Sequence, residues 1–233
     1  MRIVSWNCNG AFRKKFKAIL KYDADIYVIL ECEDPRKSKD SEYIKFANNF
    51  LWIGDSKNKG IGIFGKENIL LKKLDWSDEY EGHKVKHFLP FIINNSIKML
   101  AVWTHYNNSP TFGYIGQFWK YLKINKDKLK NAVIIGDFNS NVIWDKWERW
   151  WNHTDVIKLL NQIGLESAYH KNLKEEQGKE TKSTFFLHRK FEKSYHIDYC
   201  FAPIELNIKE FELGKYDDWI KLSDHIPILI TIA

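Results

Sequence analysis

The stretch Val133-Ile134-Ile135-Gly136-Asp137-Phe138-Asn139 constrains the fold most, because its apolar run ends on polar side chains. Two other stretches have the same character. Arg2-Ile3-Val4-Ser5-Trp6 leads into Asn7, and Ser223-Asp224-His225 precedes the apolar run 226–232. Short β-branched runs bounded by Gly, Asn or Asp predict buried strands. Carboxylates, amides and an imidazole gathered where such strands end suit a divalent-metal site that acts on phosphate.

The composition fits a single globular domain over residues 1–233. Hydrophobic residues make up 44% of the chain and aromatic residues 15%, which excludes a disordered protein. No apolar run approaches the ~20 residues that cross a membrane, and no apolar leader follows Met1. We therefore expect a cytoplasmic protein with no membrane partner. Cys8, Cys32 and Cys200 lack zinc-like spacing, so we expect them to be reduced packing residues.

The net charge of +6 favours a polyanionic partner such as nucleic acid. Basic residues gather at 13–17, 57–59 and 188–190. Lys57 and Lys59 precede an expected strand, and Arg189 lies between two expected strands. These three side chains are therefore candidates for phosphate contact, which supplies salt-dependent affinity without sequence specificity.

Many short strands and two helices are predicted. The strands are expected over residues 3–6, 26–30, 51–54, 61–64, 88–93, 98–104, 132–136, 183–187, 195–201, 208–213 and 226–232. Apolar residues at i, i+4, i+7 and i+8 predict an amphipathic helix over 11–22. A second helix is expected around 156–163, capped by Thr154 or Asp155 and ended by Gly164. This content predicts an α/β or α+β sandwich of two packed sheets flanked by helices.

Three tryptophans follow the Asp137–Asn139 stretch. Trp144, Trp147 and Trp151 have i, i+3, i+7 spacing and would share one face of a helix. Core packing is the simpler interpretation for at least two of these rings. The alternative, which the sequence leaves open, is that one ring stands at the rim of a cleft and stacks on a base. Trp144 and Trp147 are the candidates for that role.

Taken together, the motifs resemble the endonuclease/exonuclease/phosphatase superfamily in order and over nearly the whole chain. The matching stretches are 5–7, 25–31, 60–64, 103–105, 136–139, 196–199 and 223–225. The resemblance implies a four-layer sandwich of two mixed β-sheets between helices. It also implies hydrolysis of phosphate esters by in-line attack of water, with Mg²⁺ as the cofactor and Mn²⁺ able to substitute.

The resemblance identifies three metal-site residues. Glu31 resembles the principal Mg²⁺ ligand of the family, and Asn7 beside it would bind the metal or the attacking water. Asp224 resembles a ligand of a second metal site. Mg²⁺ takes few protein carboxylates and keeps several water molecules, so one Glu with supporting groups is chemically reasonable.

The resemblance also identifies residues that act on the substrate. Asp137 resembles the general base for the attacking water, and Asn139 resembles the amide that orients this water. His225 is similar to the imidazole that contacts the scissile phosphate, and Asp198 to the carboxylate that holds this imidazole. His105 resembles a histidine that contacts phosphate or protonates the leaving oxygen.

Two positions depart from the family pattern. Leu30 stands where a Gln commonly precedes the metal-binding Glu, and Glu33 is close enough in sequence to assist. Thr104-His105 stands where abasic-site endonucleases usually carry Tyr followed by Pro-Asn or Pro-Gln. The second departure argues against a dedicated abasic-site enzyme and favours the deoxyribonuclease I, deadenylase and phosphatase branches.

The favoured function is a Mg²⁺-dependent nuclease, with DNA preferred to RNA, endonucleolytic cleavage preferred and a monomer expected. One alternative is a phosphatase or phosphodiesterase for a small phosphorylated metabolite, an inositol phosphate or a lipid headgroup. Another is a nucleic-acid-binding module without catalysis. The sequence leaves open the choice between endo- and exonucleolytic cleavage and between one and two metals.

Overall fold

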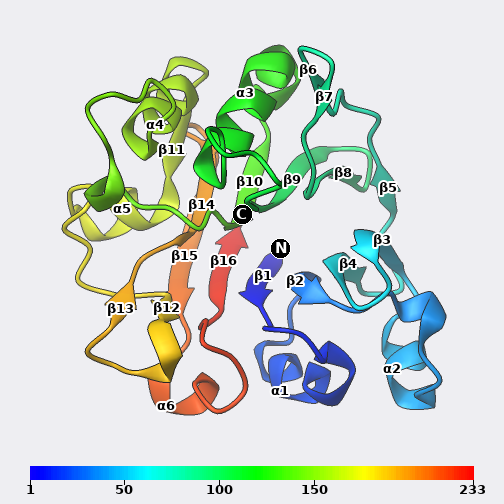
Figure 1. The fold of residues 1–233 in the computed structure, drawn as a ribbon. Coiled ribbons are helices and arrows are strands. Elements are labelled where there is room, and N and C mark those ends of the chain that lie inside the picture. Colours follow the sequence, from blue (N-terminus) through cyan, green and yellow to red (C-terminus); the bar gives the residue numbers. More distant parts are fainter.

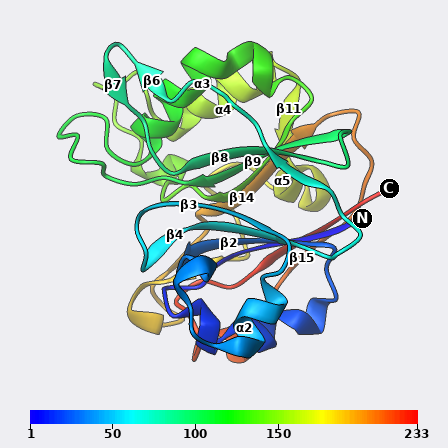
Figure 2. The ribbon, with the colours of Figure 1, turned by 90° about the vertical axis from the view of Figure 1, so that its right-hand side faces the viewer.

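A computed structural model describes residues 1–233, and its elements form four layers (Figures 1 and 2). Two six-stranded sheets pack face to face. Helices cover the outer face of each sheet, as Figure 2 shows. The predicted sandwich of two sheets between helices is thus confirmed. None of the helices combines the length and the apolar character that crossing a membrane requires.

The first sheet has the strand order β15-β16-β1-β2-β4-β3. Its central strands β1 and β2 are parallel, and its other neighbours are antiparallel. The bounds are β1 Arg2–Asn7, β2 Ile26–Cys32, β3 Phe50–Ser56, β4 Lys59–Gly65, β15 Ile208–Leu213 and β16 Ile228–Ile232.

The second sheet has the order β11-β14-β10-β9-β8-β5 and is also mixed, with β9 and β10 parallel. Its strands are β5 Leu71–Lys73, β8 Phe88–Ile93, β9 Ile97–Trp103, β10 Val133–Asp137, β11 Leu165–Ser167 and β14 Asp198–Pro203. Two small hairpins add β6 Glu79–Tyr80 with β7 His83–Lys84, and β12 Phe185–Phe186 with β13 Ser194–Tyr195.

The outer layers consist of helices of unequal length. The second sheet carries α3 Ile115–Leu129 and α4 His153–Gln162, and α5 Ala168–Leu173 lies beside β14. The first sheet carries α1 Phe16–Ile19, α2 Ser41–Phe46 and α6 Tyr216–Trp219. Single 3₁₀ turns are η1 Phe12–Lys14, η2 Leu20–Tyr22, η3 Pro35–Lys37, η4 Val142–Trp144 and η5 Leu187–Arg189.

Three apolar cores separate the four layers, and strand periodicity distributes residues among them. Ile3 lies in the core between the sheets, whereas Val4 packs toward the helices of the first sheet. In β10, Ile135 faces the core between the sheets and Ile134 faces α3 and α4. Successive side chains of a strand point to opposite faces, so a strand covered on both sides is apolar throughout. This explains why the apolar runs carried such a strong strand signal.

The helix expected over 11–22 is wrong as a continuous element. Lys15, with φ −120° and ψ −14°, interrupts it, and three short turns replace one helix. Phe12, Phe16 and Ile19 are buried as the pattern predicts, but Leu20 is 40% exposed. The apolar spacing therefore predicts correctly that Phe12, Phe16 and Ile19 are buried, but it wrongly predicts one continuous helix.

Helices α3 and α4 show two further differences from the prediction. Helix α3 was missed, because the buried amide of Asn125 interrupts its apolar face and its backbone leaves helical geometry there. Helix α4 begins after Asn152, whose side chain forms a capping box with Asp155. The expected caps Thr154 and Asp155 are thus inside the helix.

Gly136 precedes Asp137 at a position that only glycine fits. Its φ is +146°, and a Cβ there would lie 2.0 Å from the carbonyl oxygen of Val102. We expect Gly136→Ala to destabilise the fold by at least about 3 kcal/mol, because backbone atoms cannot move aside as a side chain does. Urea denaturation measures this loss.

Gly82→Ala is the matched control, since Gly82 also has a positive φ (+77°) but open space around the added Cβ. It should cost only the left-handed backbone strain of about 1–2 kcal/mol. Equal losses in the two variants would contradict the close approach between β9 and β10.

Candidate active site

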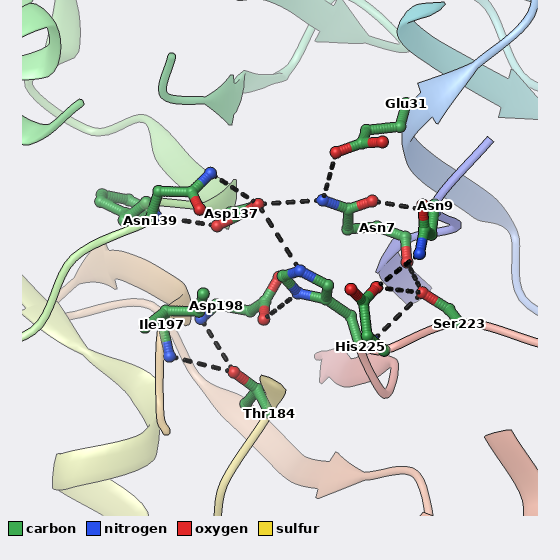
Figure 3. Close-up of polar contacts among 12 residues, drawn as sticks. Asn7, Asn9, Glu31, Asp137, Asn139, Thr184, Ile197, Asp198, Ser223 and His225 are labelled. Atoms are coloured by element: carbon green, nitrogen blue, oxygen red, sulfur yellow. Dashed lines mark hydrogen bonds and ion pairs between the residues drawn. The ribbon is translucent and has the colours of Figure 1, made fainter. Parts of the chain in front are cut away.

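Strands from both sheets end at one edge of the sandwich and place Asn7 against Asp137 (Figure 3). Asn7 is the last residue of β1, and Asp137 is the last residue of β10. The Asn7 Nδ2 donates to Oδ2 of Asp137 over 2.9 Å, in a hydrogen bond between residues 130 positions apart. Both side chains are almost inaccessible to solvent. One buried hydrogen bond therefore fixes the two strand ends relative to each other.

Asp137 accepts further hydrogen bonds from the turn that follows it. The backbone N–H of Asn139 donates to Oδ1 over 2.8 Å, and the Asn139 side-chain amide donates to Oδ2 over 2.9 Å. The same amide donates to the carbonyl of Thr104, which follows β9. Burial raises the pKa of Asp137, and the Asp198 carboxylate adds to this, although His225 opposes it. A raised pKa brings this carboxylate closer to the range in which a general base is effective.

His225 is held between two buried carboxylates. Its Nδ1 lies 2.8 Å from Asp198 Oδ2, and its Nε2 lies 4.0 Å from Asp137 Oδ2. Burial alone would lower the pKa of His225, but the neighbouring Asp198 and Asp137 carboxylates outweigh it and raise the pKa. The ring is therefore a cation at neutral pH, and both nitrogens are donors. Its Nε2 is the donor that faces Asp137 and the centre of the site (Figure 3).

Three supporting residues escaped the sequence analysis. The hydroxyl of Thr184 accepts from the backbone N–H groups of Ile197 and Asp198, each over 3.0 Å. Trp6 Nε1 donates to the carbonyl of His225 over 3.0 Å. Phe185 lies against the His225 ring, with centroids 4.7 Å apart. Thr184 and Phe185 fall inside a predicted strand, and Trp6 belongs to one of the motifs. The spacing of residues in the sequence does not predict the contacts that these three side chains make.

Glu31 reaches the site from a bulge in β2. The register shifts between Leu30 and Cys32, and Glu31 has a left-handed φ of +59°. Such a backbone is uncommon for residues other than glycine and is found at functional sites. The carboxylate accepts from the Asn7 amide over 3.3 Å and pairs with Lys59 over 2.5 Å. Glu33, considered as an assistant, instead pairs with Arg13.

Asp224 is connected to Asn7 through Asn9 and Ser223. Its Oδ1 accepts from the Asn9 side chain over 3.0 Å and from the Ser223 hydroxyl over 3.4 Å. The Ser223 hydroxyl mainly donates to the Asn7 carbonyl, over 2.7 Å. Asn9 and Ser223 therefore join the site, although the sequence analysis gave neither a role. The adjacent residues Asp224 and His225 therefore contact different partners: Asp224 accepts from Asn9, and His225 pairs with Asp198.

The oxygen atoms of Glu31 and Asp137 suit a hard divalent cation, whereas Asn7 presents its Nδ2 to both carboxylates and its Oδ1 accepts from the backbone N–H of Asn9 over 3.0 Å. The ammonium of Lys59 on Glu31 shows that this carboxylate accommodates positive charge. Another group, Asp137, Asp198 and His225, also gathers potential ligand atoms within 4.8 Å of one another. A protonated imidazole has no lone pair for a metal, however. The Glu31 side of the site therefore fits a metal better than the His225 side.

His105 follows β9 and stands at the exposed rim. Its Nδ1 accepts from the backbone N–H of Asn107 over 3.2 Å, and its ring lies 5.3 Å from the ring of His87. Burial lowers the pKa of His87 to about 4, so this neighbour is neutral at pH 7. The preceding residue, Thr104, donates its backbone N–H to the Asp137 carbonyl over 2.9 Å. Through this hydrogen bond of Thr104, His105 is held next to the end of β10, which carries Asp137.

The basic candidates occupy different surroundings. Lys59 pairs directly with Glu31 at the site. Lys57 lies on the exposed turn between β3 and β4 and forms no ion pair. Arg189 is exposed in η5 and donates to the carbonyl of Lys221 over 3.3 Å. The structure therefore brings one of the three basic candidates, Lys59, into contact with a candidate metal ligand, Glu31.

The expectation that three tryptophans share a helical face is wrong. Only η4 Val142–Trp144 is helical in this segment, and a loop follows it to the start of α4. Trp151 is buried against Phe112, whereas Trp147 is 96% exposed. Trp144 is 44% exposed and packs on Tyr195, with centroids 5.0 Å apart. Of the three rings, only Trp151 is buried in the core, whereas at least two were expected to be.

No protein-family model matches the sequence, and no curated protein sequence matches it either. Solved structures do match over the whole chain. A 3′ phosphatase from Neisseria, NExo, bound to a product DNA hairpin, is 16% identical with a TM-score of 0.73, covering 100% of this chain and 99% of that one. An AP endonuclease from Archaeoglobus fulgidus is 17% identical with a TM-score of 0.72 and the same coverage. The human Nocturnin catalytic domain with a bound sulfate anion is 13% identical with a TM-score of 0.67, covering 100% and 94%.

These neighbours belong to the endonuclease/exonuclease/phosphatase superfamily, and the present chain has the fold of that superfamily. At such low identity the likeness concerns the fold. The predicted resemblance is therefore confirmed for the architecture, and the roles of single residues have to be argued from the site itself.

The contacts of His225 predict its titration in the metal-free protein. Because its pKa is raised, the imidazolium should persist well above the ordinary value of about 6.5. The stability that this proton contributes is then fully present below about pH 6.5 and is lost as the pH rises through the raised pKa. Nuclear magnetic resonance titration of the ring measures the shift.

Asp198→Asn should move the pKa of His225 downward, because it removes the carboxylate bonded to Nδ1. Asp127→Asn is the control, since Asp127 is a 94% exposed carboxylate at the end of α3. A His225 ring that titrates near pH 6.5 in the unmodified protein would contradict the buried ion pair.

Proposed function

We propose that the protein is a metal-dependent phosphoric ester hydrolase, and specifically a Mg²⁺-dependent nuclease that prefers DNA and cleaves it endonucleolytically. The observation that supports this most is the buried group formed by Asn7, Asp137, Asp198 and His225. It combines a carboxylate of raised pKa with an imidazolium 4.0 Å away. That pairing suits activation of water beside a bound phosphate.

In this proposal, Asp137 removes a proton from the attacking water, and Asn139 holds the carboxylate and orients that water. The Nε2–H of His225 donates to a non-bridging oxygen of the scissile phosphate, where negative charge develops. Asp198 keeps the ring charged and oriented. His105 at the rim is placed to contact a phosphate or the leaving oxygen.

The metal would be held mainly by Glu31, with Asn7 beside it, and would offset charge on the phosphate and the leaving group. Mg²⁺ is the proposed ion and Mn²⁺ the expected substitute, since both favour oxygen ligands. Asp224, bonded to Asn9, is proposed as a ligand of a second, more exposed site. Lys59 would contact phosphate when the metal takes its place on Glu31.

A nucleic-acid substrate is supported by surface features. The net charge is +6, and Arg189 lies exposed without a carboxylate partner. Trp147 projects almost completely into solvent. Exposed aromatic rings beside basic residues are typical of surfaces that hold unstacked bases and backbone phosphates. The neighbour from Neisseria was solved with a DNA hairpin.

Turnover of plasmid DNA, RNA and a set of phosphorylated small molecules, each with and without Mg²⁺, tests the proposed function. DNA cleavage should depend on the metal and should disappear in Asp137→Asn, which removes the base. Binding of DNA should survive in that variant, because a neutral amide repels the polyanion less. Glu31→Gln should lower activity by orders of magnitude and leave folding normal.

Two outcomes would redirect the assignment. Turnover of inositol phosphates or sugar phosphates without DNA cleavage would favour the small-molecule phosphatase. DNA binding without turnover of any substrate would favour the non-catalytic binding module. Parallel loss of folding in Asp137→Asn, seen by circular dichroism, would show only that this carboxylate is needed for the fold.

Trp147→Ala should weaken binding of single-stranded DNA about 5- to 150-fold, because one base–aromatic stack contributes about 1–3 kcal/mol. Its melting temperature should be unchanged, since the ring is 96% exposed. Trp151→Ala is the contrasting variant, because this ring is buried and its loss should cost about 3–5 kcal/mol of stability. Fluorescence anisotropy and calorimetry measure the two effects. Unchanged DNA affinity in Trp147→Ala would eliminate base stacking by this ring.

A further inference from the structure

A polar pocket of about 330 Å³ lies next to the Glu31 side of the candidate active site. Three separate segments line it: η1, the segment from the end of β2 into α2, and the turn between β3 and β4. The backbone N–H of Asp34 donates to the carbonyl of Lys57 over 2.9 Å and joins two of these segments. The volume is at the lower end of the ~300–1,000 Å³ typical of small-molecule sites.

Positive charge dominates this pocket. Its lining includes the cations Arg13, Lys37, Lys39 and Lys57. Arg13 is already paired with Glu33, and the other acid in the lining, Asp34, is paired with Arg36. Lys37, Lys39 and Lys57 take part in no ion pair. Three ammonium groups around one pocket repel one another, and a bound anion would relieve this repulsion.

Tyr43 supplies an independent sign of a ligand. It lines the same pocket, its side chain is fully buried, and its hydroxyl has no hydrogen-bond partner. A buried hydroxyl without a partner costs stability, on the order of 1–3 kcal/mol. Such a group is uncommon in a folded protein and calls for an explanation. A phosphate oxygen would provide the missing acceptor once the pocket side chains that cover this hydroxyl move aside.

The pocket continues directly from the proposed metal site. Glu33 follows Glu31 by two residues, so their Cα atoms are at most ~7 Å apart. Lys57 precedes Lys59 by two residues, and Lys59 pairs with Glu31. A strand whose scissile phosphate lies at His225 could therefore bring a neighbouring phosphate of the same strand to this pocket.

We propose that this pocket binds a non-scissile phosphate of a nucleic-acid strand, through Lys37, Lys39, Lys57 and the Tyr43 hydroxyl. The inference rests on the proposed nuclease function and deepens it, because it defines the substrate as a polymer with phosphates on one side of the cleavage point. A small monophosphate would fill the catalytic centre and leave this pocket without a ligand.

The salt dependence of oligonucleotide binding tests the subsite directly. The Asp137→Asn protein binds a fluorescein-labelled single strand, and anisotropy is recorded at several salt concentrations. Each lost phosphate contact should reduce the slope of log K against log salt by about 0.7 for single strands. Because the pocket is proposed to hold one phosphate, adding Lys37→Gln and Lys39→Gln together should lower the slope by about 0.7. Adding Lys98→Gln, an exposed lysine at the far end of β9, removes a charge without a contact and should leave the slope unchanged.

Tyr43→Phe separates ligand binding from folding. Removal of an unpartnered buried hydroxyl should leave the melting temperature equal or higher, while oligonucleotide affinity falls by a factor of about 5, as loss of one hydrogen bond predicts. Lower stability with unchanged affinity would assign the hydroxyl a structural role and overturn its part in the subsite. An unchanged salt slope in the double lysine variant would overturn the subsite itself.

Hydrolysis of bis(p-nitrophenyl) phosphate distinguishes failure of the subsite from failure of the proposed function. This diester carries one phosphate and cannot reach the pocket from the catalytic centre. In the active protein, Lys37→Gln with Lys39→Gln should lower the ratio of kcat/KM for an oligonucleotide to kcat/KM for the diester. An unchanged ratio in an active enzyme refutes the subsite alone, whereas a wild-type protein inert toward every phosphodiester refutes the nuclease.

Discussion

The hydrogen bond between Asn7 and Asp137 is the contact on which the site depends. It connects the last residues of β1 and β10, which belong to different sheets and are separated by 130 positions. Both strands are central members of their sheets and have a parallel neighbour that ends at the same edge. The packing of the apolar faces brings the sheets together, but non-directional burial does not fix one strand end against another. A buried amide–carboxylate bond does so, because leaving either group without a partner is costly.

Burial then sets the chemistry of the charged groups. Asp137, Asp198 and His225 are each at least 95% buried, so their protonation states depend on one another more than on solvent. Desolvation raises the pKa of Asp137, and the two carboxylates raise the pKa of His225 against the effect of its own burial. When Asp137 is protonated, the positive charge of His225 and the negative charge of Asp198 cancel. The same imidazolium that stabilises the folded site can donate a proton in a hydrogen bond to a phosphate, so stability and the proposed chemistry rest on the same interactions.

The apolar runs allowed prediction of two packed sheets flanked by helices, whereas the contact between Asp198 and His225 was implied by the resemblance to the family. Other features depend on contacts that sequence spacing does not encode. Thr184 acts through backbone N–H groups of residues 13 and 14 positions away. The left-handed backbone of Glu31 arises from a bulge against β4. The tryptophan spacing suggested a helix, but Asp145 accepts hydrogen bonds from the N–H groups of His153 and Thr154 and delays the helix start until α4. Local periodicity thus predicts well which side chains are buried. It predicts poorly whether a helix is continuous when a distant side chain accepts hydrogen bonds from the backbone N–H groups.

The charge balance at the site gives a physical reason for a divalent cation. When Asp137 is ionised, four carboxylates, those of Glu31, Asp137, Asp198 and Asp224, face the two cations His225 and Lys59. Two negative charges then remain close to the position proposed for an anionic phosphate, and like charges would oppose its approach. In the proposed function, a divalent cation at Glu31 would offset this excess and would displace the Lys59 ammonium from the carboxylate. In the same proposal, the Lys59 ammonium would then pair with the phosphate instead of with Glu31.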